Sequence, residues 1–351
     1  MVKKFIAEIL KTEKLNSLAE QYVSTPLEYH SRVSQDFQAE IYIKREDRID
    51  DFGCGNKLRK LSYIIPHAIE MNSTILITAG SLPSNQCKAV AKLAQENNLR
   101  AHVVFGGDNQ ILPHAAHGNY LLTTLLEPTI SWFENSPWKS ISEKINIIAE
   151  EEKRKGERPY IIDSGASAWP GLLGSIELGF ELAVQVKEKR LSISDIVVPA
   201  GSGGTCLGIK IAAEILQLPW RVFGICIGEN AVAVKNRTLT LRKEAANYIN
   251  YPIDKDDGLL IFTDFAIGKG YDKAEPEELN LMQKALREYQ LILDPNYMLK
   301  TFIGLKKLLF HNQIKEKSGV VLVHTGGQFG LFDNGLRFSA WHQKRYSSLL
   351  K

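Results

Sequence analysis

The chain has 351 residues, of which 44% are hydrophobic and 24% are charged, and its formal net charge is +3 at pH 7. This composition is typical of a globular protein, and the length suits two domains or one large domain that carries a smaller one. Acidic and basic residues are interspersed, so we expect no nucleic-acid partner. No apolar run is long enough to cross a membrane, and the apolar segment after Lys4 is too short for a signal peptide.

Four cysteines are scattered along the sequence, at positions 54, 87, 206 and 226. A chain of this length needs no disulfide framework, so we expect reduced thiols and a cytoplasmic location. The eight histidines form no ligand spacing with these cysteines, so we expect no bound metal. Cys87 and Cys206 are expected to be small buried apolar residues.

Short β-branched runs alternate with stretches of helical periodicity along most of the chain. In chain order, the runs predict strands at Glu40–Lys44, Thr74–Thr78, Ala101–Phe105, Tyr160–Ile162, Ile196–Val198, Val222–Ile225 and Val320–Val323. The stretches predict helices at Asn56–Ile69, Ser84–Glu96, Pro113–Leu126, Pro137–Lys155, Leu172–Lys187, Ile209–Leu216, Pro276–Tyr289 and Tyr297–Phe310. This alternation is typical of an α/β fold with mostly parallel sheets.

Three of the predicted strands end in loops rich in glycine and small polar residues: those after Thr78, Val198 and Val323. In open α/β sheets, ligands bind beyond the carboxyl ends of parallel strands. If these strands are parallel and adjacent, we expect the three loops to face one crevice that suits a polar cofactor.

The loop Gly201-Ser202-Gly203-Gly204-Thr205 lies between a predicted strand and a predicted helix. Glycines let successive backbone N–H groups converge at a helix N-terminus, and the two hydroxyls add further donors, so the loop predicts a phosphate site. It lacks the spacing and the lysine of a nucleoside-triphosphate loop. A glycine-rich turn that serves only strand–helix packing is the alternative interpretation.

Lys57 stands at the start of a predicted helix, behind two glycines. The positive end of the helix dipole disfavours an ammonium there, so we expect a lowered pKa and an amine that can act as a nucleophile or form a Schiff base. The neighbouring Arg59 and Lys60 are expected to be solvated surface charges, which is also the alternative for Lys57. A phosphate loop together with such an amine matches pyridoxal 5'-phosphate, which carries one phosphate and one aldehyde.

From Thr25 to Phe332 the chain resembles the fold type II pyridoxal-phosphate enzymes, and within them the 1-aminocyclopropane-1-carboxylate deaminase and D-cysteine desulfhydrase family. The segments that carry the resemblance, in the family's order, are Lys44–Asp47 with Gly55–Leu61, Ser84–Gln86, Gly201–Thr205, the tyrosine segments Gly270-Tyr271 and Asp294–Tyr297, and His324–Gly327.

The resemblance implies a tryptophan-synthase-β-like fold with two open, twisted, mostly parallel sheets flanked by helices. It implies a small domain of residues 51–160 inserted into a large domain of residues 1–50 and 161–351. A small amino acid as substrate and a homodimer are also implied.

The resemblance further implies a role for each matching residue. The implied catalytic residues are Lys57, which bonds the cofactor and moves the Cα proton, Ser84, which receives the substrate carboxylate, and Tyr271 and Tyr297, which donate protons or position the leaving group. The implied cofactor-binding residues are Lys57, Asn85 at the ring oxygen, Gly201, Ser202, Gly203, Gly204 and Thr205 at the phosphate, and Thr325 near the ring nitrogen. A helix cap at Ser84 or Asn85, and core packing of the tyrosines, are the alternatives.

Three departures from the family pattern bear on the substrate. Met298 follows the second tyrosine, where the deaminases have Glu and the desulfhydrases commonly Thr, and a methionine cannot donate to or charge-stabilise a pyridine nitrogen. This counts against aminocyclopropane deamination, whereas Gln86 in place of a desulfhydrase-type His favours it. The third departure is Gly80-Ser81-Leu82-Pro83, which stands before Ser84-Asn85 where the family usually has Gly-Gly-x-Gln. We expect a deaminating lyase, foremost a D-cysteine desulfhydrase that forms pyruvate, hydrogen sulfide and ammonia.

The alternatives are 1-aminocyclopropane-1-carboxylate deamination, dehydration of D-serine-like substrates, a non-catalytic pyridoxal-phosphate-binding protein, and a phosphate-ligand binder without a Schiff base.

Overall fold

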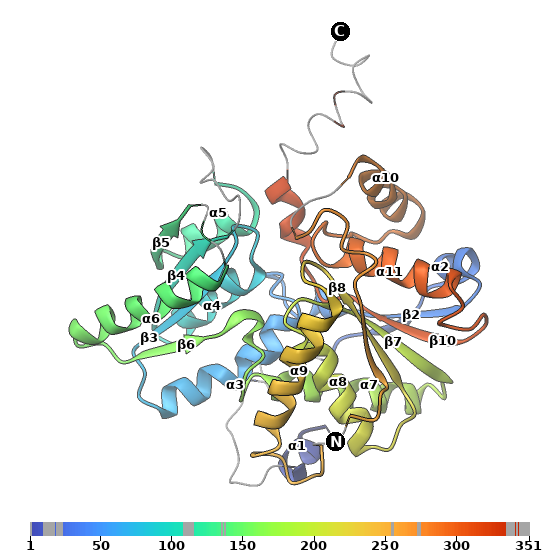
Figure 1. The fold of residues 1–351 in the computed structure, drawn as a ribbon, viewed down its shortest axis with the longest axis horizontal. Helices are drawn as coiled ribbons and strands as arrows, with labels where there is room; N and C mark the ends of the chain where they lie inside the picture. The colour runs from blue at the N-terminus through green and yellow to red at the C-terminus, as the bar shows by residue number, and fades with distance from the viewer. Residues whose placement is uncertain are drawn as a thin grey trace.

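The computed structural model describes residues 2–9, 18, 24–107, 116–134, 136, 138–253, 256–271, 275–334, 341 and 343. In this part of the chain two β-sheets lie beside each other, each with helices against it (Figure 1). The fold type II architecture expected from the sequence is therefore confirmed.

The larger sheet has six strands in the order β1-β2-β10-β7-β8-β9. Only β1 is antiparallel to its neighbour, and the other pairings are parallel. The strands are β1 (Leu27–Tyr29), β2 (Glu40–Lys44), β7 (Ile193–Ala200), β8 (Arg221–Cys226), β9 (Leu260–Thr263) and β10 (Gly319–Val323).

The smaller sheet has four parallel strands in the order β5-β4-β3-β6. These strands are β3 (Ile75–Gly80), β4 (Arg100–Gly106), β5 (Thr129–Phe133) and β6 (Pro159–Ile162).

Helices fill the connections between the strands. The α-helices are α1 (Val2–Ile9), α2 (Ser31–Phe37), α3 (Asn56–Glu70), α4 (Asn85–Glu96), α5 (Gly118–Leu125), α6 (Trp138–Arg154), α7 (Leu172–Glu188), α8 (Gly204–Ile215), α9 (Ala231–Ala245), α10 (Pro276–Lys284) and α11 (Met298–Phe310). A π-helical turn, η4 (Ala285–Tyr289), extends α10, and short 3-10 turns are η2 (Glu46–Arg48), η3 (Ser164–Ala166) and η5 (Gln328–Asn334).

Both faces of the larger sheet are buried, because alternate residues of its central strands enter different hydrophobic clusters. Val321 and Val323 of β10 pack in the cluster that contains α1, α7 and α8. Val320 and Leu322 pack in the cluster that contains α2, α10 and α11. Burial on both faces explains why these strands read as continuous apolar runs rather than as alternating ones.

The central strands of both sheets were predicted from the sequence, but β1, β5 and β9 were not. All three are edge strands of three to five residues, so they lack the long apolar run of a strand that is covered on both sides. Helices α1, α2 and α9 were also not predicted. The predicted helix from Pro113 begins in the structure at Gly118, and residues 113–115 lie outside the described residues.

The expected division into two domains stays a prediction. The four strands of the smaller sheet come from residues 75–162, so the expected boundary at residue 160 falls inside β6. Helix α3 links the two parts: Tyr63 belongs to the large-sheet cluster, while Leu61 and Ile65 pack in a small-sheet cluster. Within the described residues, no helix combines the length and apolarity needed to cross a bilayer.

Candidate active site

The loops after β7 and β10 lie side by side, because these two strands are parallel neighbours in the larger sheet. The third loop, which follows β3, belongs to the smaller sheet. The condition under which the three loops would face one crevice, that all three strands are adjacent, is therefore not met. The carboxyl end of β3 is instead connected to the other two by α3, as the contacts below show.

Lys57 is the second residue of α3, as predicted, and its side chain is half-buried. Burial lowers the pKa of its ammonium to about 8, an effect that the nearby Cys87 thiol opposes. The preceding turn needs glycine: Gly55 has a φ of +59°, and a Cβ there would lie 2.2 Å from the carbonyl oxygen of Thr325. A lysine of lowered pKa thus lies next to the loop that follows β10, and the main cause is burial, whereas the sequence led us to expect the helix dipole.

Asn56 connects three of the predicted segments. Its backbone N–H donates to the carbonyl of Thr325 at 3.1 Å, and its side-chain amide donates to Thr205 Oγ1 at 3.0 Å. The residue beside Lys57 therefore fixes the start of α3 to the loop after β10 and to the predicted phosphate loop. The sequence analysis did not assign a role to Asn56.

The predicted phosphate loop connects β7 to α8. Gly203, with a φ of +83°, is the N-cap residue of α8, and because it has no side chain it leaves the first N–H groups of the helix uncapped. The N–H groups in the first turn of a helix have no acceptor within that helix. The turn therefore presents backbone donors at the positive end of a 12-residue helix, which is the geometry of an anion site.

Two buried residues lie directly behind this loop. Ser202 Oγ is 2.8 Å from Ser167 Oγ, and Ser167 Oγ in turn accepts a hydrogen bond of 2.9 Å from Lys60 Nζ. Lys60 is only 2% exposed, and burial together with nearby Lys57 lowers its pKa well below the usual value. The expectation that Lys60 is a solvated surface charge is wrong, since its partners come from a distant segment.

The same correction applies to Arg59, which is 1% exposed. Its guanidinium pairs with Glu46 at 2.5 Å and with Glu181 at 3.0 Å. Both carboxylates lie on other elements, η2 and α7, which face α3 in the fold.

Ser84 and Asn85 lie at the start of α4, where the smaller sheet meets α3. Ser84 is the N-cap of α4, because its Oγ accepts from the backbone N–H of Cys87 at 3.2 Å. The Oδ1 of Asn85 accepts a bond of 2.9 Å from Asn119 of α5, a residue that the sequence analysis missed. Both predicted residues are almost completely buried. The capping role is thus observed for Ser84, and its hydroxyl proton can serve a second acceptor.

Gln86 is turned toward the ends of β3 and β6. Its side-chain amide donates to Thr78 Oγ1 at 2.9 Å and to the carbonyl of Asp163 at 2.8 Å. The next residue, Cys87, is fully buried, and burial raises the pKa of its thiol to about 12. Both observations agree with packing roles for these two side chains, and the buried, apolar character expected of Cys87 and Cys206 is confirmed.

The two predicted tyrosines meet, although 26 residues separate them in the sequence. The hydroxyls of Tyr271 and Tyr297 are 3.1 Å apart, and the rings pack edge to face. Tyr297 is held by Asp294, whose carboxylate accepts the backbone N–H groups of residues 296, 297 and 298 at 2.8 to 2.9 Å. Asp294 therefore caps α11 and was missed as a positioning residue.

Thr325 lies in the loop after β10, and its side chain contacts the residue that departs from the family pattern. Its hydroxyl is 3.9 Å from the sulfur of Met298, close enough for a weak O–H···S hydrogen bond. Both side chains are buried. In the same loop, the Nε2 of His324 is 2.9 Å from the carbonyl of Ile292, and burial lowers the pKa of the imidazole.

Contacts at the start of α3 and in the loops beside it join several of the predicted site segments. Asn56 joins Lys57 to the loops of Thr205 and Thr325, Cys87 links Lys57 to Ser84, and Met298 links Thr325 to Tyr297. The residues that the sequence analysis missed are Asn56, Lys60, Asn119, Ser167 and Asp294. Each was missed because its partner is distant in sequence or because its residue type carries no pattern of its own.

The chemistry of this donor set fits a group with one phosphate and one aldehyde. Uncapped N–H groups at the start of α8, together with the Ser202 hydroxyl that Ser167 and Lys60 orient, suit a phosphate. The Lys57 amine, whose pKa burial lowers to about 8, suits a carbonyl carbon. The residues present therefore fit pyridoxal phosphate.

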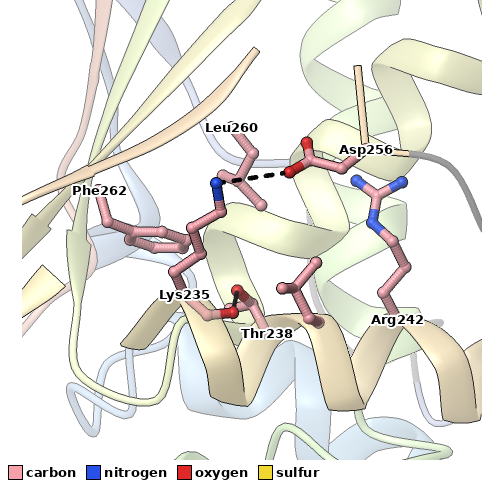
Figure 2. A pocket seen from close by; sticks show the side chains of 7 residues that line it. Lys235, Thr238, Arg242, Asp256, Leu260 and Phe262 are labelled. Atoms are coloured by element: carbon pink, nitrogen blue, oxygen red, sulfur yellow. Dashed lines mark hydrogen bonds and ion pairs between the residues drawn. The ribbon is translucent and has the colours of Figure 1, made fainter. Parts of the chain in front are cut away.

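A separate small hollow lies beside α9 (Figure 2). Lys235, Thr238 and Arg242 of α9 line it, together with Asp256 and Phe262. Its volume of about 10 Å³ holds one water molecule at most. Lys235 and Asp256, which both line it, form an ion pair at 3.7 Å.

Comparison with known proteins agrees with the geometry. The family described as pyridoxal-phosphate dependent enzyme matches residues 18–326. A protein of Pyrococcus horikoshii, provisionally named 1-aminocyclopropane-1-carboxylate deaminase, is 32% identical over 89% of this chain and 91% of its own. A protein of Klebsiella pneumoniae named D-cysteine desulfhydrase is 29% identical over 88% of this chain and 93% of its own.

A solved structure described as an ACC deaminase homologue superposes with a TM-score of 0.83 at 29% identity, and the match covers 97% of this chain and 98% of that one. Nearly the whole chain therefore has a counterpart in these relatives. The chain belongs to the fold type II pyridoxal-phosphate-dependent enzymes, in the family of the 1-aminocyclopropane-1-carboxylate deaminases and D-cysteine desulfhydrases, and its cofactor is pyridoxal phosphate.

Proposed function

We propose that this pyridoxal-phosphate-dependent lyase is a D-cysteine desulfhydrase. The reaction converts D-cysteine and water to pyruvate, hydrogen sulfide and ammonia. The observation that carries the substrate assignment is the pair of Met298 and Thr325: the side chain after Tyr297 is a buried thioether that contacts a neutral hydroxyl, where an aminocyclopropane deaminase has a carboxylate. Gln86, which favoured the deaminase in the sequence, bonds to Thr78 and to the Asp163 carbonyl, and this weakens its link to the substrate.

When bound, pyridoxal phosphate supplies the electron withdrawal that makes the Cα proton of an amino acid acidic. Lys57 is the amine that bonds the cofactor and then takes this proton. Burial suits it to both tasks, because a pKa of about 8 leaves a useful fraction of neutral amine near neutral pH. The backbone donors of Gly203, Gly204 and Thr205 and the hydroxyl of Ser202 would hold the phosphate, and Lys60 orients Ser202 through the hydroxyl of Ser167.

The other predicted residues bind and orient the substrate. Ser84 accepts a backbone N–H through its oxygen, so its own proton is free to bind the substrate carboxylate. Asn85, oriented by Asn119, would hold the ring oxygen of the cofactor, and Thr325 would bind near the ring nitrogen. The hydroxyl pair of Tyr271 and Tyr297 can pass a proton to the departing sulfur, because one hydroxyl of the pair can donate while the other replaces its proton.

The experiment is an assay of keto-acid release by the cofactor-loaded enzyme. D-Cysteine, L-cysteine, D-serine and 1-aminocyclopropane-1-carboxylate are offered in parallel, and pyruvate, 2-oxobutanoate and sulfide are measured. We expect pyruvate and sulfide from D-cysteine at a kcat/KM at least tenfold above those of the other compounds. Release of 2-oxobutanoate instead would establish aminocyclopropane deamination, and no keto acid from any compound would favour a binding protein.

We also propose a cytoplasmic homodimer. All four cysteines are buried free thiols, which agrees with a reducing compartment. Light scattering of the purified protein tests the assembly: a mass of twice 39.4 kDa is expected, and 39.4 kDa alone would contradict it.

A further inference from the structure

Lys300 is a buried cation to which the reaction above gives no task. It lies in the first turn of α11, three residues after Tyr297, and its side chain has no exposed surface. Burial lowers the pKa of the ammonium, and the carboxylate of Glu278 on α10 opposes this shift. A buried lysine is costly unless its charge and its hydrogen-bonding protons find partners, so its partners indicate its role.

The ammonium of Lys300 donates to the carbonyl oxygen of Ile267. That carbonyl also accepts the N–H of Gly270 at 3.1 Å, which closes a turn over residues 267–270. Tyr271 is the next residue in the chain. The lysine therefore holds the turn that delivers Tyr271, while its own helix begins beside Tyr297.

The turn also runs close to the carboxylate of Glu278. A Cβ on Gly268 would lie 3.2 Å from Glu278 Oε1 and 3.8 Å from Lys300 Nζ, and Gly268 has a φ of +59°. Glu278 is itself fixed, since its other oxygen accepts the N–H of Glu275 at 2.7 Å in the capping box of α10. The turn is thus held against both α10 and α11.

We propose that Lys300 is a positioning residue for the tyrosine pair: it fixes the turn 267–270 against α11 so that the hydroxyls of Tyr271 and Tyr297 meet at 3.1 Å. This inference rests on the proposed function, because it takes the pair to act on the substrate. Lys300 would act through the backbone of the turn, since its ammonium donates to the Ile267 carbonyl.

The same helix offers a matched control. Lys307, two turns after Lys300, donates to the carbonyl of Phe265 at 2.6 Å, at the beginning of the same loop. Lys307 is therefore a second lysine of α11 that bonds a carbonyl of this loop, but the carbonyl it bonds is farther from Tyr271 in the sequence.

The test compares Lys300→Met and Lys307→Met in the wild-type and in the Tyr271→Phe backgrounds, with kcat and KM measured for D-cysteine. We expect Lys300→Met to lower kcat roughly tenfold or more, as loss of a proton-transfer group does, with KM changed by about twofold at most. In the Tyr271→Phe background, Lys300→Met should change kcat by less than about twofold, because the pair is already lost. Equal losses in both backgrounds, or a wild-type kcat in Lys300→Met, would overturn the proposal.

A second readout needs no turnover. Hydrogen exchange at the amide of Gly270 reports directly on the turn, and we expect it to be roughly tenfold faster in Lys300→Met and unchanged in Lys307→Met. If the wild type releases no pyruvate from D-cysteine, the proposed function fails, while exchange at Gly270 still decides whether Lys300 holds the turn. Unchanged exchange in Lys300→Met would refute the positioning role.

Discussion

Asp294 shows how one buried residue positions a functional side chain. Its carboxylate is 1% exposed and accepts three backbone N–H groups at the start of α11, one of them from Tyr297. Burial raises its pKa to about 6, although these three bonds favour the charged form. The residue therefore titrates in a range where ordinary aspartates remain ionised.

The titration of Asp294 gives a pH-dependent contribution to stability. Its pKa is about 6 in the folded state and 3.8 for an ordinary aspartate, so protonation favours folding. The contribution is fully present below pH 3.8 and is lost as the pH rises through 6. We expect the wild type to gain up to about 3 kcal/mol relative to Asp294→Asn when the pH falls from 7 to 4. Urea unfolding of both proteins at the two pH values measures this, and parallel pH profiles would contradict it.

At this scale, the sequence predicts residues whose type and immediate neighbours define the chemistry. Lys57 behind its glycines and the loop of Gly203 were both predicted in this way. Arg59 and Lys60 were assigned to solvent because partners that compensate them come from other elements of the fold. Glu181 lies 122 residues from Arg59, and Ser167 lies 107 residues from Lys60. Only the fold shows which distant groups compensate such a charge.

At the scale of elements, the junction of β7 and α8 is the most tightly defined part of the site. A Cβ on Gly203 would lie 2.2 Å from Cγ2 of Thr238, and its φ of +83° disfavours any other residue. A Cβ on Gly201 would meet only Ile227, at 3.4 Å, which is an ordinary contact. Of these two glycines in one loop, Gly201 therefore has room for a side chain and Gly203 does not.

This difference predicts the outcome of a pair of substitutions. Gly203→Ala should lower the free energy of unfolding by about 1–3 kcal/mol, through overpacking and backbone strain, and should weaken pyridoxal-phosphate binding. Gly201→Ala should change the free energy of unfolding by less than about 0.5 kcal/mol. Denaturant unfolding measures the stabilities, and titration of the bound-cofactor absorbance measures the affinity. Equal stability of the two variants would count against the tight packing of Gly203.

The sequence predicts central elements better than peripheral ones, for a physical reason. The central strands β7 and β10 are buried on both faces and read as apolar runs, whereas β1, β5 and β9 lie at sheet edges and carry no such run. The apolar pattern alone does not show which strands share a sheet. It left open whether the loop after β3 lies beside those of β7 and β10, and the pairing places β3 in the other sheet.

At the scale of the whole molecule, a buried ion network ties the catalytic helix to the larger sheet. Arg59 of α3 pairs with Glu46 and Glu181, and Lys44 of β2 also pairs with Glu181. All four side chains are at least nine-tenths buried, and their formal charges cancel. The network joins β2, η2, α3 and α7 directly behind Lys57.

Breaking this network should destabilise the protein strongly. Arg59→Leu leaves two buried carboxylates with one cation, so we expect a loss of about 3–5 kcal/mol in the free energy of unfolding. Arg48→Leu is the control, because Arg48 pairs with Glu28 in a half-exposed surface bridge and should change stability by about 1 kcal/mol at most. Urea unfolding compares the two, and similar losses would show that the buried network is no more important than the surface pair.

The central claim is that the segments of the site converge on Lys57 as the residue that holds the cofactor. Borohydride reduction of the loaded enzyme, followed by proteolysis and mass spectrometry, tests it directly, because reduction fixes the cofactor permanently to the amine that holds it. We predict a pyridoxyl-phosphate mass on the peptide that contains Lys57, located at that residue by fragmentation and absent from Lys57→Ala. A label on Lys60, or no label on any lysine of a protein that binds the cofactor, would contradict the account.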